Sequence, residues 1–222
     1  MYMKFRFRLL TLIFILIVSA NGCDAAPPQD GTAQQSVPAA NTTTVEDKFE
    51  NANGWETIAG SWTAETSGDR TVLKQAATDQ TFPVTLLTQP AFSDVDVTVK
   101  FHPISGEVDA SAGIVFRAQD GANYFIVRAN SLEDNIRLYA TVAGTRKQIA
   151  STKLDAPAIG QWHTLRVTAV GDHIQAYLND KLLIDHVDDR FKSGRVGLWT
   201  KADAVTEFDD FKVTGTTVET SK

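Results

Sequence analysis

Residues 113–130 read GIVFRAQDGANYFIVRAN, and this stretch decides the fold that we expect. Large apolar residues two positions apart occur on both sides of Asp120-Gly121, so that Ile114 and Phe116 share one face of a strand, and Phe125 and Val127 share one face of another. Aspartate and glycine tolerate the positive φ angles that tight hairpins require. The stretch therefore predicts two antiparallel strands, each with one face in a hydrophobic core.

The same pattern continues along the chain from Val45 onward. The pairs Ala143-Gly144, Gly171-Asp172 and Asn179-Asp180 each separate two further alternating runs, and no stretch shows the 3.6-residue period of an amphipathic helix. The expected strands are Ser61–Thr66, Thr71–Ala76, Phe82–Thr88, Asp94–Phe101, Ala112–Ala118, Tyr124–Ala129, Ile136–Val142, Lys147–Ser151, Trp162–Val170, His173–Asn179, Lys181–His186, Arg195–Thr200 and Thr206–Val213. So many short strands predict an all-β domain, a two-sheet antiparallel β-sandwich of the jelly-roll type.

The N-terminus has the features of a secretory signal. A basic segment ending at Arg8 precedes the apolar run Leu9–Val18, which is about half the ~20 residues that a membrane-spanning helix requires. Gly22-Cys23 resembles the bacterial lipobox, in which a small residue precedes a cysteine that is acylated. We therefore expect residues 1–22 to be a lipoprotein signal peptide and Cys23 to carry lipid. Ordinary cleavage that leaves a free thiol is the alternative.

The stretch after the cysteine is rich in Ala, Pro, Gln and Thr and contains almost no large apolar residue. We expect residues 23–44 to form the lipidated cysteine and a flexible linker, 45–215 the sandwich domain and 216–222 a C-terminal tail. The domain would then lie outside the cytoplasm in the cell envelope, anchored to a membrane by lipid. With 21 Lys and Arg against 27 Asp and Glu, the net charge of −6 argues against nucleic acid as a partner.

A family resemblance appears in the two halves of the predicted domain. Residues 113–120 and 123–135, and then 162–167, 194–201 and 208–211, resemble the concanavalin A-like lectin/glucanase sandwich. Within it, the chain is similar to the 3-keto-disaccharide hydrolase domain family and to the laminin-G-like domains. The resemblance spans about Glu46–Val213 and implies the fold. It leaves function open, because this fold hosts lectins, glycosidases and interaction modules.

One set of side chains is expected on the face of the strands that points away from the core. Its members are Arg117, Tyr124, Arg128, Arg137 and Tyr139, from three neighbouring strands, and Trp199 from another. If those strands pair in order, tyrosine rings could stack on sugar rings, while arginine forks donate hydrogen bonds to hydroxyls or a carboxylate. The set therefore predicts a ligand-binding face for a glycan or small saccharide. The alternative is that the stems and rings of these side chains only cover the sheet face, while their polar ends stay hydrated.

Catalytic and metal sites are weakly indicated. The glucanases of this superfamily carry Glu-x-Asp-x-Glu on one strand, whereas Glu107-Val108-Asp109 lacks the third acid and is expected to be a solvated loop. The catalytic residues, if there are any, therefore stay unknown. Two groups of acids, Asp185 with Asp188 and Asp189, and Asp209 with Asp210, could offer oxygen ligands to calcium. They lack the spacing of a calcium loop, so we expect surface acids, no metal site and no cofactor.

Three functions remain open on these grounds. The first is a membrane-tethered lipoprotein whose sandwich binds carbohydrate through the arginine and tyrosine residues. The second is a glycoside hydrolase of the 3-keto-disaccharide type, as the resemblance implies. The third is a protein-interaction or envelope-structural module, which should present an exposed apolar patch. Whether the protein is an enzyme is not decided by the sequence.

Overall fold

The computed structural model describes residues 41–218. The expected signal peptide, Cys23 and most of the expected linker lie outside the described residues. The strands are β1 (Thr42–Asp47), β2 (Trp55–Ala59), β3 (Trp62–Ser67), β4 (Arg70–Gln75), β5 (Val84–Leu87), β6 (Ala91–Ser105), β7 (Ser111–Asp120), β8 (Asn123–Asn130), β9 (Asn135–Val142), β10 (Thr145–Lys153), β11 (His163–Val170), β12 (His173–Leu178), β13 (Lys181–Val187), β14 (Arg195–Trp199) and β15 (Val205–Val218). Within 41–218, no helix has the length and apolar character needed to cross a membrane.

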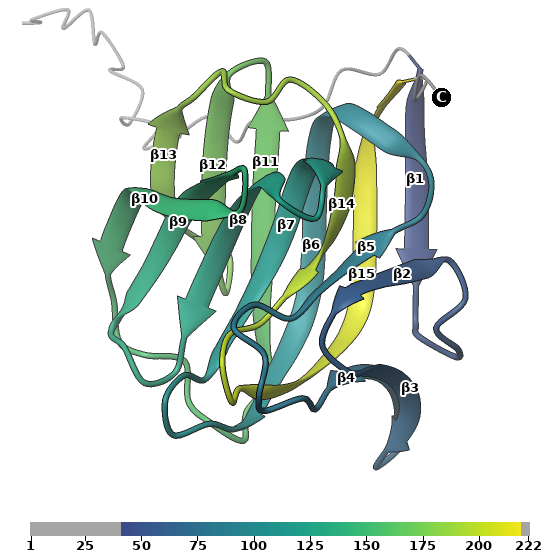
Figure 1. Ribbon diagram of the computed structural model, residues 1–222, viewed down its shortest axis with the longest axis vertical. Helices are drawn as coiled ribbons and strands as arrows, with labels where there is room; N and C mark the ends of the chain where they lie inside the picture. The colour runs from purple at the N-terminus through teal and green to yellow at the C-terminus, as the bar shows by residue number, and fades with distance from the viewer. Residues whose placement is uncertain (1–40, 219–222) are drawn as a thin grey trace, which may run out of the picture. The chain divides into compact units, whose positions relative to one another are not determined.

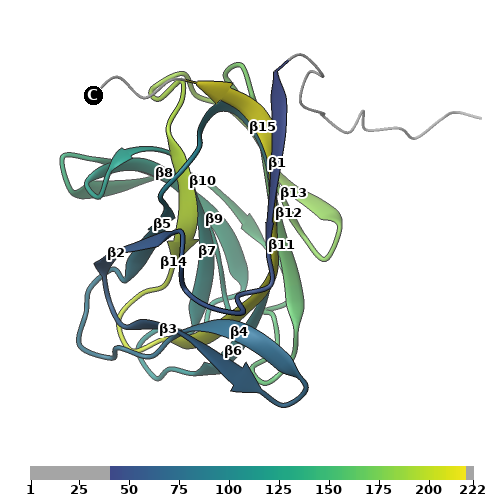
Figure 2. The same cartoon turned by 90° about the vertical axis from the view of Figure 1, so that its right-hand side faces the viewer.

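The strands form two antiparallel sheets packed face to face, which confirms the predicted sandwich. The eight-stranded sheet has the order β13-β12-β11-β6-β15-β4-β3, with β1 paired to β15. The seven-stranded sheet has the order β10-β9-β8-β7-β14-β5-β2 and lies in front in Figure 1. The side view in Figure 2 shows the two sheets as separate layers. Strands β7 to β10 therefore pair in chain order, as the predicted binding face requires.

The main core lies between the two sheets. Ile114, Phe116, Phe125 and Val127, which the alternation placed on inward faces, are all fully buried there. They come from β7 and β8, and similar pairs on β9, β11, β12 and β14 complete the core. Because alternate residues of a strand point to opposite faces, burying these side chains fixes which residues of the seven-stranded sheet point outward.

Three of the predicted hairpin turns contain residues with positive φ, as expected, whereas the turn after Asp120 between β7 and β8 contains none. Ala143 and Gly144 between β9 and β10 have φ angles of 48° and 77°, and Asn179 and Asp180 between β12 and β13 have 49° and 64°. The β7–β8 turn lies one residue later than expected, because β7 extends through Asp120. These turns fix the register of the strands that they join.

The structure places the start of the domain earlier than predicted. Thr42–Thr44, which the sequence analysis assigned to the linker, belong to β1 and pair with Thr214–Thr216 of β15. These three threonines carry no hydrophobic period, so the sequence did not indicate a strand here. In the structure, Thr44 and Thr214 share a side-chain hydrogen bond of 2.9 Å. Val45 packs against the core, and β15 continues to Val218, beyond the expected end at 215.

Candidate functional site

The outer face of the seven-stranded sheet brings together most of the predicted binding residues. The pairings Trp199↔Gly113, Gly113↔Arg128 and Arg128↔Arg137 place these residues in one row across β14, β7, β8 and β9. Gly113 has no side chain, and the Ile126 side chain packs over it, since a Cβ atom at Gly113 would come 3.1 Å from Ile126 Cδ1. This register follows from the burial of the opposite face, since a shift of one residue would turn the arginines into the core.

A further row, separated from the first by the row of Tyr139 and Ile126, brings in a residue that was not among those expected from the sequence. Tyr124 pairs with Thr141, and Thr141 pairs with Arg146 of β10. Arg146 therefore has the same orientation as Arg128 and Arg137, and we call these three residues the arginine cluster. The signal was present in the sequence: the two-residue turn Ala143-Gly144 fixes the position of Arg146 opposite β9.

Glu133 and Tyr139 hold two members of the arginine cluster in place. Arg128 Nη2 donates to Glu133 Oε2 at 3.0 Å and to the Tyr139 hydroxyl at 3.2 Å. Arg137 Nη1 lies 2.9 Å from the same oxygen of Glu133 and donates to the Tyr139 hydroxyl at 3.4 Å. One carboxylate thus serves two guanidinium groups.

Arg146 lies on aromatic rings instead of on a carboxylate. Its guanidinium carbon is 4.4 Å from the ring centroid of Tyr139, 4.5 Å from that of Phe82 and 5.2 Å from that of Trp199. These are cation–π distances, and the indole of Trp199 is fully buried. The guanidinium of Arg146 therefore covers ring faces on which we expected a sugar to stack. A ligand at this face would meet the N–H donors of Arg146 and not these aromatic rings.

Several of these donors have no partner. Arg128 Nε and Nη1, Arg137 Nε and Arg146 Nη1 are buried and make no hydrogen bond within residues 41–218. Arg128 as a whole is only 1% exposed. An unsatisfied buried donor is costly, and buried polar groups are nearly always hydrogen-bonded in folded proteins. A group with acceptor oxygens that reached these atoms would satisfy them.

The charges around Glu133 keep its carboxylate ionised, so that it acts as a hydrogen-bond acceptor. Burial raises the pKa of its carboxyl group, but hydrogen bonds from Asn135 and Arg128, with the charges of Arg128 and Arg137, outweigh burial and lower the pKa to about 2. Glu133 is therefore ionised at neutral pH and poorly suited to donate a proton as a general acid.

The Glu133→Gln variant tests this assignment through pH. A carboxyl group whose folded pKa is about 2, below its unfolded value of 4.5, stabilises the fold above pH 4.5 and loses that contribution as the pH falls towards 2. We expect wild-type protein to have the higher melting temperature at pH 7 and the two curves to converge near pH 2. A difference that stayed constant over that range in thermal unfolding followed by circular dichroism would contradict the assignment.

Two predicted residues have other surroundings. The structure does not bring Arg117 to the arginine cluster: its Nε donates to the backbone oxygen of Ser93 at 2.9 Å and its Nη1 to that of Phe191 at 3.2 Å. Its φ of 50° and the irregular register after Phe116 break the alternation on which the prediction relied. Tyr124 does lie on the face, but it is only 2% exposed, and burial raises the pKa of its hydroxyl.

Asp109 is also placed differently from the expectation. The sequence predicted a solvated loop, whereas Asp109 is fully buried and its Oδ2 accepts hydrogen bonds from Lys201 Nζ at 2.9 Å and Asn130 Nδ2 at 3.1 Å. The loop is closed from the other side, because the Asp203 carboxylate accepts the backbone N–H groups of residues 107–109. Asp109 and the partly exposed Lys201 therefore form an ion pair next to Asn130.

The acids considered as calcium ligands are bound to other side chains. Asp185 accepts hydrogen bonds from His173 and Gln175, and Asp188 lies 3.0 Å from Arg190. The remaining ion pairs are Asp189 with Lys192, Asp209 with Arg70, and Asp210 with Lys48 and Lys100. Within 41–218, no three His, Cys, Asp or Glu residues are grouped so as to hold a metal ion.

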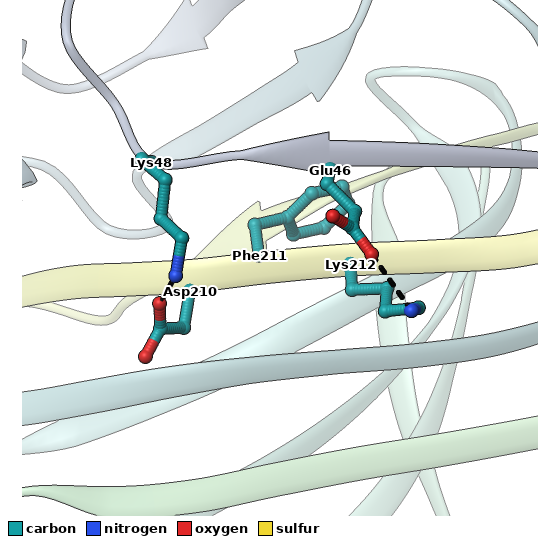
Figure 3. Close-up of a pocket in the computed structure, with 5 residues that line it drawn as sticks. All are labelled: Glu46, Lys48, Asp210, Phe211 and Lys212. Atoms are coloured by element: carbon teal, nitrogen blue, oxygen red, sulfur yellow. Dashed lines mark hydrogen bonds and ion pairs between the residues drawn. The ribbon is translucent and has the colours of Figure 1, made fainter.

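A surface hollow elsewhere does not compete with this site. It has a volume of about 220 Å³ and lies beside β1 and β15. Figure 3 shows its charged lining paired internally, with Lys48 bound to Asp210 and Glu46 bound to Lys212 at 2.7 Å. Because these exposed charges satisfy one another, the hollow offers little to a ligand.

Comparisons with known proteins agree with this fold. The levanase of Bacillus subtilis is 27% identical over 151 residues, which are 67% of this chain, and the chain spans only 21% of the levanase. The carbohydrate-binding module CBM66 of Bacillus subtilis has a TM-score of 0.63 and 24% identity, covering 72% of this chain and 94% of the module. The β-glucanase of Bacillus licheniformis has a TM-score of 0.56 and 12% identity, covering 78% of this chain and 97% of the enzyme.

The family is settled by a match to nearly the whole described domain, residues 42–214. Its fold is shared with carbohydrate-binding modules and glucanases, in keeping with the resemblance seen in the sequence. The chain belongs to the family of 3-keto-alpha-glucoside-1,2-lyase-like domains.

Proposed function

We propose that this protein is a membrane-tethered extracytoplasmic lipoprotein that binds carbohydrate through the arginine cluster. The observation that carries the proposal is the group of buried guanidinium N–H groups without partners on Arg128, Arg137 and Arg146. Sugars present many closely spaced oxygen acceptors, and a site whose donors are already oriented loses little entropy on binding them.

The family and its relatives support a sugar as the ligand. The relatives include a levanase and a carbohydrate-binding module, so levan oligosaccharides belong among the first ligands to be tested. The tether rests on the Gly22-Cys23 pattern alone, and the envelope location rests on the tether.

A glycoside hydrolase of the 3-keto-disaccharide type is the competing proposal. The family description also names an enzyme that breaks glycosidic bonds, a 3-keto-alpha-glucoside 1,2-lyase, although a lyase cleaves by elimination and not by hydrolysis. The carboxylates described at this face favour binding over proton transfer. Glu133 is held by two arginines, and Asp109 is bound to Lys201. A general acid needs a proton at the working pH, which these pairings oppose for Glu133.

The Arg137→Gln variant tests the proposed site. The full chain in detergent is screened on a glycan array that includes levan oligosaccharides, and any hit is measured by calorimetry. Losing a charged donor at the half-exposed edge of the face should weaken binding about tenfold or more. Arg166→Gln is the matched control, because Arg166 also lies over a tyrosine and against a carboxylate, Tyr177 and Asp96, but on the eight-stranded sheet.

The two variants distinguish binding at the arginine cluster from binding elsewhere on the protein. Weakened binding in Arg137→Gln together with wild-type binding in Arg166→Gln would support the site. Equal binding in both would place the ligand elsewhere. Release of a sugar product from a bound glycan would favour the hydrolase instead.

A further inference from the structure

The outer face of the seven-stranded sheet carries more positive charge than its own acids balance. The arginine cluster brings three guanidinium groups together, and Glu133 is shared by Arg128 and Arg137. Arg146 has aromatic rings against it in place of a carboxylate. Asp109, the buried acid at the end of the face, already pairs with Lys201. This excess stands out in a chain whose net charge is −6.

The excess is concentrated between Arg128 and Arg146. The guanidinium carbons of Arg128 and Arg146 both lie against the Tyr139 ring, 5.8 Å and 4.4 Å from its centroid, so the two cations are close together. Burial lowers the pKa of the Arg146 guanidinium, and the charge of Arg128 lowers it further. Arg128 Nε and Nη1 and Arg146 Nη1 are the buried donors left without a partner on these two residues. An anion in contact with both would relieve the repulsion and satisfy the donors together.

A neutral sugar would satisfy the donors only in part. A hydroxyl group donates as well as accepts, so it also needs an acceptor in the site, whereas arginine can only donate. Two acceptors at the cluster, Glu133 Oε2 and the Tyr139 hydroxyl, already receive hydrogen bonds from Arg128 and Arg137. Asn135 Oδ1, on the amide that also binds Glu133, is a buried acceptor without a partner within residues 41–218, but the unpartnered N–H groups of the arginine cluster outnumber it. A carboxylate accepts only, and its planar pair of oxygens matches the fork of a guanidinium group.

We propose that the ligand of this face is an acidic glycan, recognised through the carboxylate of a uronic acid residue that binds between Arg128 and Arg146. The inference rests on the proposed carbohydrate-binding function and narrows it to one class of ligand. Phe82, Tyr139 and Trp199 hold Arg146 over the face by cation–π contact, so the guanidinium is already in place before the ligand arrives.

The test compares each acidic glycan with its own uncharged form. Binding of the full chain in detergent is measured by calorimetry with pectate, alginate and glucuronoxylan oligosaccharides, with their carboxyl-reduced counterparts and with levan oligosaccharides. We expect at least one acidic glycan to bind about tenfold or more tightly than its reduced form and to weaken in high salt. Arg146→Gln should abolish that preference, whereas Arg166→Gln should keep it.

The outcomes distinguish the inference from the function on which it rests. If levan or the reduced glycans bind as tightly as the acidic ones, with loss in Arg146→Gln, the acidic ligand is wrong and the binding site stands. If the acidic preference survives in Arg146→Gln, the carboxylate binds elsewhere and the inference fails. If no glycan binds to protein that melts normally, the inference and the proposed function fail together.

Discussion

Replacing Asp109 with alanine is expected to lower the free energy of unfolding by about 3 kcal/mol, because breaking a buried ion pair from one side leaves its partners uncompensated. Asp109 is fully buried and accepts hydrogen bonds from Lys201, Asn130 and the backbone N–H of Ser111. Ser111 and Asn130 are also fully buried and would keep unpaired donors. Since Lys201 can still reach solvent, the loss should fall at the lower end of the range for buried pairs.

The surface pair of Asp189 and Lys192 supplies the control for Asp109. Both side chains are mostly exposed and lie 3.3 Å apart, so Asp189→Ala should change stability by less than about 0.5 kcal/mol. Urea unfolding of the two variants measures the contrast directly. Equal, small effects would show that the loop of Asp109 is not held by its carboxylate.

The Gly197→Ala variant is expected to cause a loss of similar size by a different route. Gly197 lies in β14 between β7 and β5, where a Cβ atom would come 2.2 Å from the backbone oxygen of Thr85. A backbone atom cannot rotate away as a side chain can, so the strands must separate. We expect about 3 kcal/mol of destabilisation, or roughly 6–12 °C in melting temperature.

Gly144→Ala separates crowding from backbone strain. Gly144 has a φ of 77°, but a Cβ atom there would meet nothing within 4 Å, so only the strained backbone costs about 1 kcal/mol. At Gly197 the opposite holds: the backbone has no positive φ, but an added Cβ atom would clash with the backbone oxygen of Thr85. A smaller loss in Gly197→Ala than in Gly144→Ala would mean that β5 and β14 can move apart at little cost.

The sequence predicted the strands from Trp62 onward and missed β1 and β2. β7 and β8 were expected because inward residues two positions apart, such as Ile114 and Phe116, occur on both sides of Asp120-Gly121. β1 begins with three consecutive threonines, which carry no hydrophobic period, and it is held by pairing with β15 at the other end of the chain. Pairing between such distant segments leaves no local trace in the sequence.

The sequence predicted those parts of the candidate site where side chains alternate regularly between the two faces of a strand. Arg128, Arg137 and Tyr139 lie together because β8 and β9 pair in regular register through these positions. Arg117 follows the last regular pair of β7, and its positive φ turns its side chain away from the expected face. The cation–π contact between Arg146 and Trp199 joins β10 and β14, which are not neighbouring strands in the sheet. No pattern within one strand could predict this contact.

The antiparallel pairing of β1 with β15 also determines how this domain can be joined to other protein. Thr42 lies opposite Thr216, so the two ends of the described chain leave from neighbouring positions on the eight-stranded sheet, while the arginine cluster belongs to the other sheet. Domains whose ends lie close together can be attached or inserted through one point without disturbing the rest. The described sandwich meets this geometric condition, and the region of the levanase that matches this chain forms about a fifth of that protein.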